Sequence, residues 1–143
     1  MKKIYYLLAL LLIASTSYAA SSATQAVVKL NGGLRMLEIF AVCDSDGSFS
    51  SWNTKEINGA VTYADTIPVS APTANYDITL KNSDGLDIFG TALSNRSATT
   101  PERARPLNNG NDTWVPNLGP LTLDIANNTA TTAEVTIKVW WYE

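Results

Sequence analysis

The sequence contains no histidine and a single cysteine, Cys43. Without histidine, the chain lacks the usual general base, the Ser-His and Cys-His nucleophile pairs, and the commonest transition-metal ligand. One cysteine supports neither an internal disulfide nor a tetrahedral zinc site built on thiolates. Cys43 ends an apolar run, so we expect a buried, inert thiol, with a cross-link between chains as the alternative.

The remaining routes to catalysis are a carboxylate pair or a Ser-Lys arrangement, and neither has a recognisable signature here. Candidate carboxylates occur along the chain, but any acidic β-protein supplies such residues. We therefore expect a protein that is not an enzyme, with no catalytic residue, no bound metal and no cofactor.

Charged residues are also scarce, at 16% of the chain, and acidic residues outnumber basic ones by 13 to 10. The first nineteen residues hold two lysines and no acidic residue, so the remainder carries a net charge of −5. Nucleic acids and anionic membranes both require a basic surface. We expect neither nucleic-acid binding nor membrane association of the mature protein.

One long hydrophobic run, residues 4–14, follows Lys2 and Lys3 and reads IYYLLALLLIA. It is shorter than the roughly 20 residues that a spanning helix needs. Ser17 and Ala19 place small residues at the −3 and −1 positions of a cleavage site. The pattern predicts a signal peptide over residues 1–19, with an uncleaved anchor as the alternative. We expect an exported protein, whether periplasmic, at the cell surface or extracellular.

Beyond residue 19, no amphipathic helix longer than two turns is visible. Instead, short stretches of alternating apolar and polar residues are separated by Asn, Asp, Gly and Pro. Strands are predicted over residues 25–30, 34–43, 49–52, 61–69, 76–81, 121–125 and 135–142. Many short strands with frequent turns predict an all-β domain over residues 20–143, a single antiparallel β-sandwich of about seven or eight strands.

The alternation also predicts the core. The expected core residues are Val28, Ile39, Tyr76, Ile78, Leu80, Leu121, Leu123, Ile125, Val135, Ile137, Val139 and Trp141. Residues 20–24 are small and polar, and we expect a loose leader there. Pro68 and Pro72 bracket a segment that should be extended but should not lie centrally in a sheet.

The most individual stretch is residues 76–106. It begins as a β-hairpin, with strands over residues 76–81 and 86–89 joined by a turn. A polar loop with Arg96, Arg103 and Arg105 follows. These arginines either contact carboxylates across a subunit or partner interface, or pair with nearby acidic residues in a solvated loop.

The last strand carries aromatic side chains on both faces. Trp141 shares the apolar face, whereas Trp140 and Tyr142 fall on the opposite, polar face. Aromatic residues on a polar face predict a second contact, either a subunit interface or a platform for a ligand such as a sugar. Together with the three arginines, Trp140 and Tyr142 are the candidate interface residues.

Two acidic turns, residues 44–47 and 82–87, have the composition of calcium loops. Calcium needs six to eight oxygen ligands, and neither turn continues with the ligands or the final glutamate of an EF-hand loop. Hairpin turns favour Asp, Asn and Gly on their own account. We interpret both stretches as turns.

Several stretches of the C-terminal half share a recognisable pattern. They are residues 76–80 (YDITL), 84–88 (DGLDI), 95–102 (NRSATTPE) and 119–123 (GPLTL), followed by an apolar, aromatic terminal strand. In this pattern the chain resembles small β-rich proteins encoded among the virion-structural genes of tailed phages and prophages. The resemblance implies a structural or assembly role, with no active site to carry over.

Virion proteins assemble in the cytoplasm, so the predicted signal peptide departs from this pattern and leaves room for an exported relative at the cell surface. We expect an exported structural or assembly subunit, virion-associated or at the cell surface, that associates with itself or with another structural protein. The alternative is an extracellular carbohydrate-binding module that uses exposed aromatic residues.

Overall fold

The computed structural model describes residues 20–108 and 110–143, and the predicted signal peptide lies outside this part of the chain. The described chain is all-β with antiparallel pairing throughout. The only helical turn among these residues is a short 3-10 element, η1 (Asn31–Gly33). No helix in the described part is long and apolar enough to cross a membrane.

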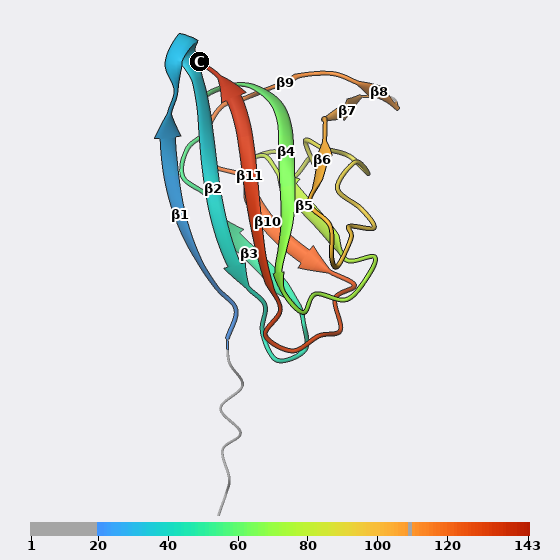
Figure 1. Cartoon of the computed structure of the whole chain (residues 1–143). Coiled ribbons are helices and arrows are strands. Elements are labelled where there is room, and N and C mark those ends of the chain that lie inside the picture. Colours follow the sequence, from blue (N-terminus) through green and yellow to red (C-terminus); the bar gives the residue numbers. More distant parts are fainter. Residues whose placement is uncertain (1–19, 109) are drawn as a thin grey trace, which may run out of the picture.

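The larger sheet has six strands (Figure 1). In order they are β1 (Ser22–Lys29), β2 (Leu34–Val42), β11 (Glu134–Tyr142), β4 (Gly59–Ser70) and β6 (Glu102–Ala104), with β9 (Val115–Asn117) also paired to β4. The strands β2 and β11 have alternating buried positions, as the sequence predicts. They occupy the middle of the sheet, whereas β1 forms one edge.

A second sheet of three strands lies behind the long strands in Figure 1. Its order is β3 (Phe49–Asn53), β10 (Thr122–Ala126) and β5 (Asp77–Lys81). A two-stranded hairpin, β7 (Leu107–Asn108) and β8 (Asn111–Asp112), projects beside β6 and β9. The two larger sheets contribute to one hydrophobic core, in which Ile39 and Ile137 of the first sheet cluster with Ile78 and Leu123 of the second.

Eleven of the twelve predicted core residues are buried, and Val28 is the exception, at 38% exposed. Val28 lies opposite Met36 in the register of β1 and β2, whereas Leu37 and Ile39 of β2 face the core. Because side chains alternate along a strand, Val28 points to the outer face of the sheet. The prediction for Val28 was wrong because the pairing register decides which of two adjacent valines faces inward.

The strand count and the leader also differ from expectation. Eleven strands occur among the described residues, because several have only two or three residues and carry no visible alternation. The first strand begins at Ser22, so the expected loose leader is largely part of β1. Pairing with β2 gives these small residues the backbone hydrogen bonds that a leader would lack.

The predicted return strand over residues 86–89 is absent from the structure. Only a single bridge joins Lys81 to Asp87, after which the chain turns and buries Ile88 and Phe89 in the core. The Asp87 carboxylate accepts the backbone N–H groups of Leu80 and Phe89 at 3.3 and 3.1 Å. These hydrogen bonds close a turn. Ile88 and Phe89 therefore contribute to the core from a turn, rather than from a strand paired with β5.

Pro68 lies within β4, and beyond Thr66 this strand pairs with β11 alone, so the segment is extended but not central, as expected. The pairing with β11 shifts register between Glu134 and Val135, opposite this proline. On the other side, β6 pairs only as far as Thr66. A bulge and a locally free edge accommodate a residue without an N–H donor.

Candidate functional site

Outward-facing side chains form rows across the larger sheet. One row contains Glu38 of β2, Lys138 of β11, Asp65 of β4 and Arg103 of β6, which are direct neighbours in the strand registers. Their charges alternate from strand to strand, and we call this row the charge ladder. Opposite charges on neighbouring strands stabilise the pairing.

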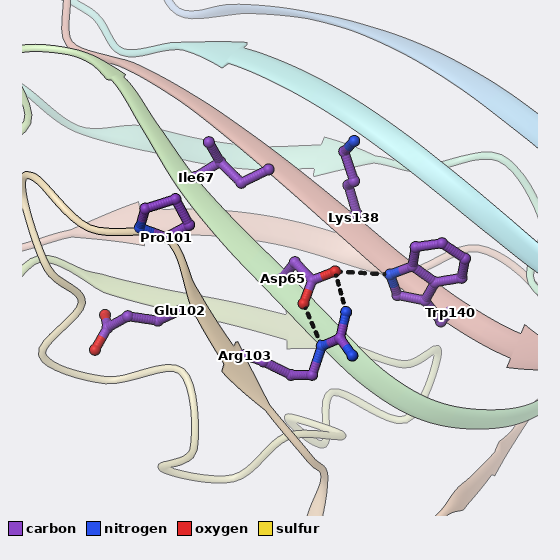
Figure 2. A pocket seen from close by; sticks show the side chains of 7 residues that line it. All are labelled: Asp65, Ile67, Pro101, Glu102, Arg103, Lys138 and Trp140. Carbon is purple, nitrogen blue, oxygen red and sulfur yellow. Dashed lines mark hydrogen bonds and ion pairs between the residues drawn. The ribbon is translucent and has the colours of Figure 1, made fainter.

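Within the charge ladder, Asp65 is the residue at which the hydrogen bonds drawn in Figure 2 converge. Its carboxylate accepts hydrogen bonds from Arg103 Nε at 2.6 Å and Nη2 at 3.0 Å, and from Trp140 Nε1 at 3.0 Å. The fork of the guanidinium matches the two carboxylate oxygens. Hydrogen bonding to Asp65 raises the pKa of the Arg103 guanidinium above its usual value.

Two aromatic rings border this ion pair. Tyr63 and Trp140 lie with ring centroids 5.3 Å apart, and Arg103 Cζ lies 4.2 Å from the centroid of Tyr63. The guanidinium therefore has both a carboxylate and an aromatic face as partners, a cation–π arrangement. Trp140 is half-buried within its own chain, and its only polar group already donates to Asp65.

A shallow hollow of about 340 Å³ lies beside the charge ladder. Its lining residues, drawn in Figure 2, are Asp65, Ile67, Pro101, Glu102, Arg103, Lys138 and Trp140. The charged groups of the lining have partners in the same chain: Lys138 pairs with Glu38 at 3.8 Å, and Glu102 with Arg96 at 3.7 Å. Such a surface is suited to holding strands together.

The three predicted arginines do not share one environment. Arg96 is largely buried, donates to the Ser94 carbonyl at 3.3 Å and pairs with Glu102. Arg103 lies on β6, so the expectation of an irregular loop was wrong over Glu102–Ala104. Both pair with carboxylates of their own chain. Asp65 and Arg103 are 38 residues apart, so no local pattern could have revealed their pairing.

Arg105 and Tyr142 meet instead at a second hollow, of about 440 Å³, which we call the aromatic hollow. Its lining residues are Thr62, Tyr63, Arg105, Asp112, Thr113, Trp114 and Tyr142. Trp114 is 62% exposed and Tyr142 is 49% exposed. The candidate interface residues did not include Trp114 or Asp112, because only the fold brings these two residues beside Arg105 and Tyr142.

The free edge of β1 is the third feature of this surface. β1 is hydrogen-bonded only to β2, and its other side has no partner among the described strands. Val27 on one face and Val28 on the other are both exposed, and Leu30 follows them. We call this feature the β1 edge.

In both acidic turns, side-chain oxygens accept hydrogen bonds from backbone N–H groups of the same turn. Asp44 accepts from the Asp46 N–H at 3.0 Å, and Asp46 from the Ser48 N–H at 2.7 Å. Hydrogen bonding with Asp44 and Ser48 lowers the pKa of Asp46. Asn82 accepts from two backbone N–H groups of the other turn, each at 3.0 Å. Residues 20–108 and 110–143 contain no cluster of three or more His, Cys, Asp or Glu that could hold a metal ion.

Cys43 is a free, buried thiol, as predicted. Burial raises its pKa, which keeps it protonated and unreactive.

Comparison with known proteins returns no match to any family model, curated protein or solved structure. The features that bear on function are therefore those of the molecule itself. They are the charge ladder, the aromatic hollow and the β1 edge.

Proposed function

We propose that this chain is an exported, non-enzymatic structural or assembly subunit, virion-associated or at the cell surface, that acts through protein–protein contacts. The β1 edge carries the proposal. It presents eight residues of strand with unpaired backbone groups to solvent. A free edge of this length is a template for the addition of another strand.

The β1 edge lacks the features that normally protect a sheet edge. Edge strands are commonly shortened, bulged, or interrupted by proline and charge. β1 contains no proline, pairs with β2 without a register shift, and has one charged residue, Lys29, at its end. The opposite edge is formed by β6 and β9, with three residues each. In the smaller sheet, β3 pairs with β10 through a register shift.

The partner that fits the β1 edge best is a second copy of the same strand in antiparallel orientation. The two Lys29 side chains would then lie at opposite ends of the pair, so that like charges do not meet. Small and apolar residues such as Ala26 and Val28 would face each other across the new pairing. The larger sheet would continue from one subunit into the next.

A single β-sandwich over residues 20–143 is part of this proposal. It is supported by the two larger sheets and by the one core to which both contribute.

Export is supported by the basic, then apolar, then small-residue order of the N-terminus. Residues 1–19 fused to a reporter that is active only outside the cytoplasm should give activity, and an inactive fusion would contradict export.

Ala26→Lys tests the assembly role directly. Residue 26 lies near the middle of β1 and opposite Glu38 of β2, so a lysine there is compatible with the folded monomer. In an antiparallel pair of β1 strands the two new lysines would lie close together. We expect self-association of the full chain to weaken at least tenfold, which corresponds to about 1.4 kcal/mol. Sedimentation equilibrium measures this change.

The matched control is Leu118→Lys, which adds the same charge at a position that is 81% exposed and outside β1. It should leave self-association unchanged. A wild-type protein that stays monomeric at about 100 μM, well above common subunit affinities, would overturn the proposal. Equal weakening by both lysines would show that the effect does not depend on the β1 edge.

A further inference from the structure

We propose that the aromatic hollow is a binding site for a neutral saccharide, in which Trp114 and Tyr142 stack on the sugar ring and Arg105 and Asp112 hydrogen-bond to its hydroxyl groups. This site is separate from the β1 edge, and it gives the subunit a ligand besides its own copies.

The two most exposed rings of the hollow lie at or beside the ends of strands. Tyr142 ends β11 and is paired with Ala60 of β4, while Trp114 directly precedes β9, which pairs with the other side of β4. Tyr142 therefore lies at the end of one strand that flanks the beginning of β4, and Trp114 lies in the connection just before the other. Sites built on regular elements keep their side chains in place before the ligand arrives.

These two rings leave much of their surface exposed in the folded chain. Trp114 remains 62% exposed, although a tryptophan can bury about 150–250 Å². Trp141, by comparison, is 2% exposed in the core, and Trp140 donates its N–H to Asp65. Exposed aromatic surface with a polar rim marks a site of interaction.

The two charged side chains of the hollow are exposed. Arg105 and Asp112 form no ion pair with any residue in the described ranges, in contrast to Arg103, which Asp65 neutralises. A guanidinium supplies several hydrogen-bond donors, and a carboxylate supplies only acceptors. Together they can therefore pair with sugar hydroxyl groups both as acceptors and as donors. Their charges cancel, which favours a neutral ligand over an anionic one.

The hydroxyl groups at the rim add further acceptors. Thr62 donates to the Trp140 carbonyl at 3.1 Å and Thr113 to the Trp114 carbonyl at 3.2 Å, which leaves the oxygen of each free to accept. The hollow volume of about 440 Å³ falls within the range of about 300–1,000 Å³ that is usual for small-ligand sites. A pyranose has an apolar ring face edged by hydroxyl groups, and this matches aromatic rings edged by polar groups.

A glycan array followed by calorimetry with the best neutral hit tests the proposal on the full chain, with cellohexaose and chitohexaose as named probes in solution. We expect Trp114→Ala to weaken binding at least tenfold and Trp114→Phe to retain most of it, because the ring face is kept. Asp112→Asn should weaken binding through loss of charged hydrogen bonds. Leu118→Ala removes an apolar side chain that is outside the hollow and more exposed than Trp114, and it should leave binding unchanged.

Three results would overturn this inference: no neutral glycan binding with a Kd below about 1 mM, equal binding by wild type and Trp114→Ala, or loss of self-association in Trp114→Ala. The last result would identify the hollow as a protein interface. Ala26→Lys separates the two proposals, because it should disrupt association at the β1 edge while leaving saccharide binding intact.

Discussion

Asp65 is the residue on which the hydrogen bonds of the outer face converge. It joins three strands, because it lies on β4 and accepts from Arg103 on β6 and Trp140 on β11. Its side chain is only 17% exposed, while that of Arg103 is 59% exposed. The carboxylate is thus the more sheltered partner, and its removal leaves two donors without their acceptor.

We expect Asp65→Ala to lower the free energy of unfolding by about 1–2 kcal/mol. A hydrogen bond to a charged group contributes about 1.5–3 kcal/mol, and the exposure of Arg103 reduces the contribution of the ion pair. Glu38→Ala is the matched control from the same ladder, since its ion pair with Lys138 is 3.8 Å long and exposed. That loss should stay below about 0.5 kcal/mol. Urea unfolding of both variants makes the comparison, and equal losses would contradict a central role for Asp65.

The loops between β2 and β3, between β4 and β5, and between β10 and β11 meet at one end of the two larger sheets. Asn128, which is buried, accepts from the Thr73 N–H at 2.9 Å and donates to the Gly47 carbonyl at 3.0 Å. The Thr132 N–H donates to the Asp44 carbonyl at 3.1 Å. Loops that carry no alternating pattern are therefore held by a buried amide and by backbone contacts.

Gly47→Ala tests how closely the elements approach at this end. A Cβ at Gly47 would lie 2.1 Å from the Asn128 carbonyl oxygen, and the backbone there has φ +84°. Gly85 has a similar φ of +79° but no atom within 4 Å of the added Cβ, so Gly85→Ala isolates the conformational cost.

For Gly85→Ala we expect a loss of about 1–2 kcal/mol in unfolding free energy, the usual cost of a left-handed backbone for an L-residue. Gly47→Ala should lose about 2 kcal/mol more, because the backbone of the Asn128 loop must move. Chemical denaturation measures both. Similar losses in the two variants would mean that the two loops are not in close contact.

At the scale of the whole molecule, the ionisation of Tyr76 makes the free energy of unfolding depend on pH. It is fully buried in the shared core, and its hydroxyl has no hydrogen-bond partner among the described residues. Burial, with a smaller contribution from the charge of Glu102, raises its pKa from 10.0 to about 12. The folded state therefore favours the protonated phenol more strongly than the unfolded state does.

This contribution to stability is fully present below pH 10 and is lost as the pH rises through about 12. We expect the wild type to lose up to about 3 kcal/mol over that window, and Tyr76→Phe to lose correspondingly less. At pH 7 the variant should be close to neutral, because the removed hydroxyl has no partner. Unfolding free energies at pH 8, 10 and 11 test this, and parallel pH curves for the two proteins would contradict it.

The sequence by itself determined the class of fold and most of the core. Alternation along residues 121–125 and 135–142 predicted β10 and β11 and the faces that they bury. This succeeds because the two-residue period of a strand is a local property, visible wherever one face is buried. Turn composition likewise predicted the turns within residues 44–47 and 82–87.

Only the tertiary structure determined which residues and strands, far apart in the sequence, are neighbours in space. The pairing of Asp65 with Arg103, the position of Trp114 and Tyr142 at one hollow, and the free edge of β1 all depend on strand order and register. These are set by contacts between residues far apart in the chain, and a shift of one residue reverses the faces of a whole strand. Val28 and Arg103 were misplaced for this reason, since neither edge position nor a three-residue strand leaves a pattern in the local sequence.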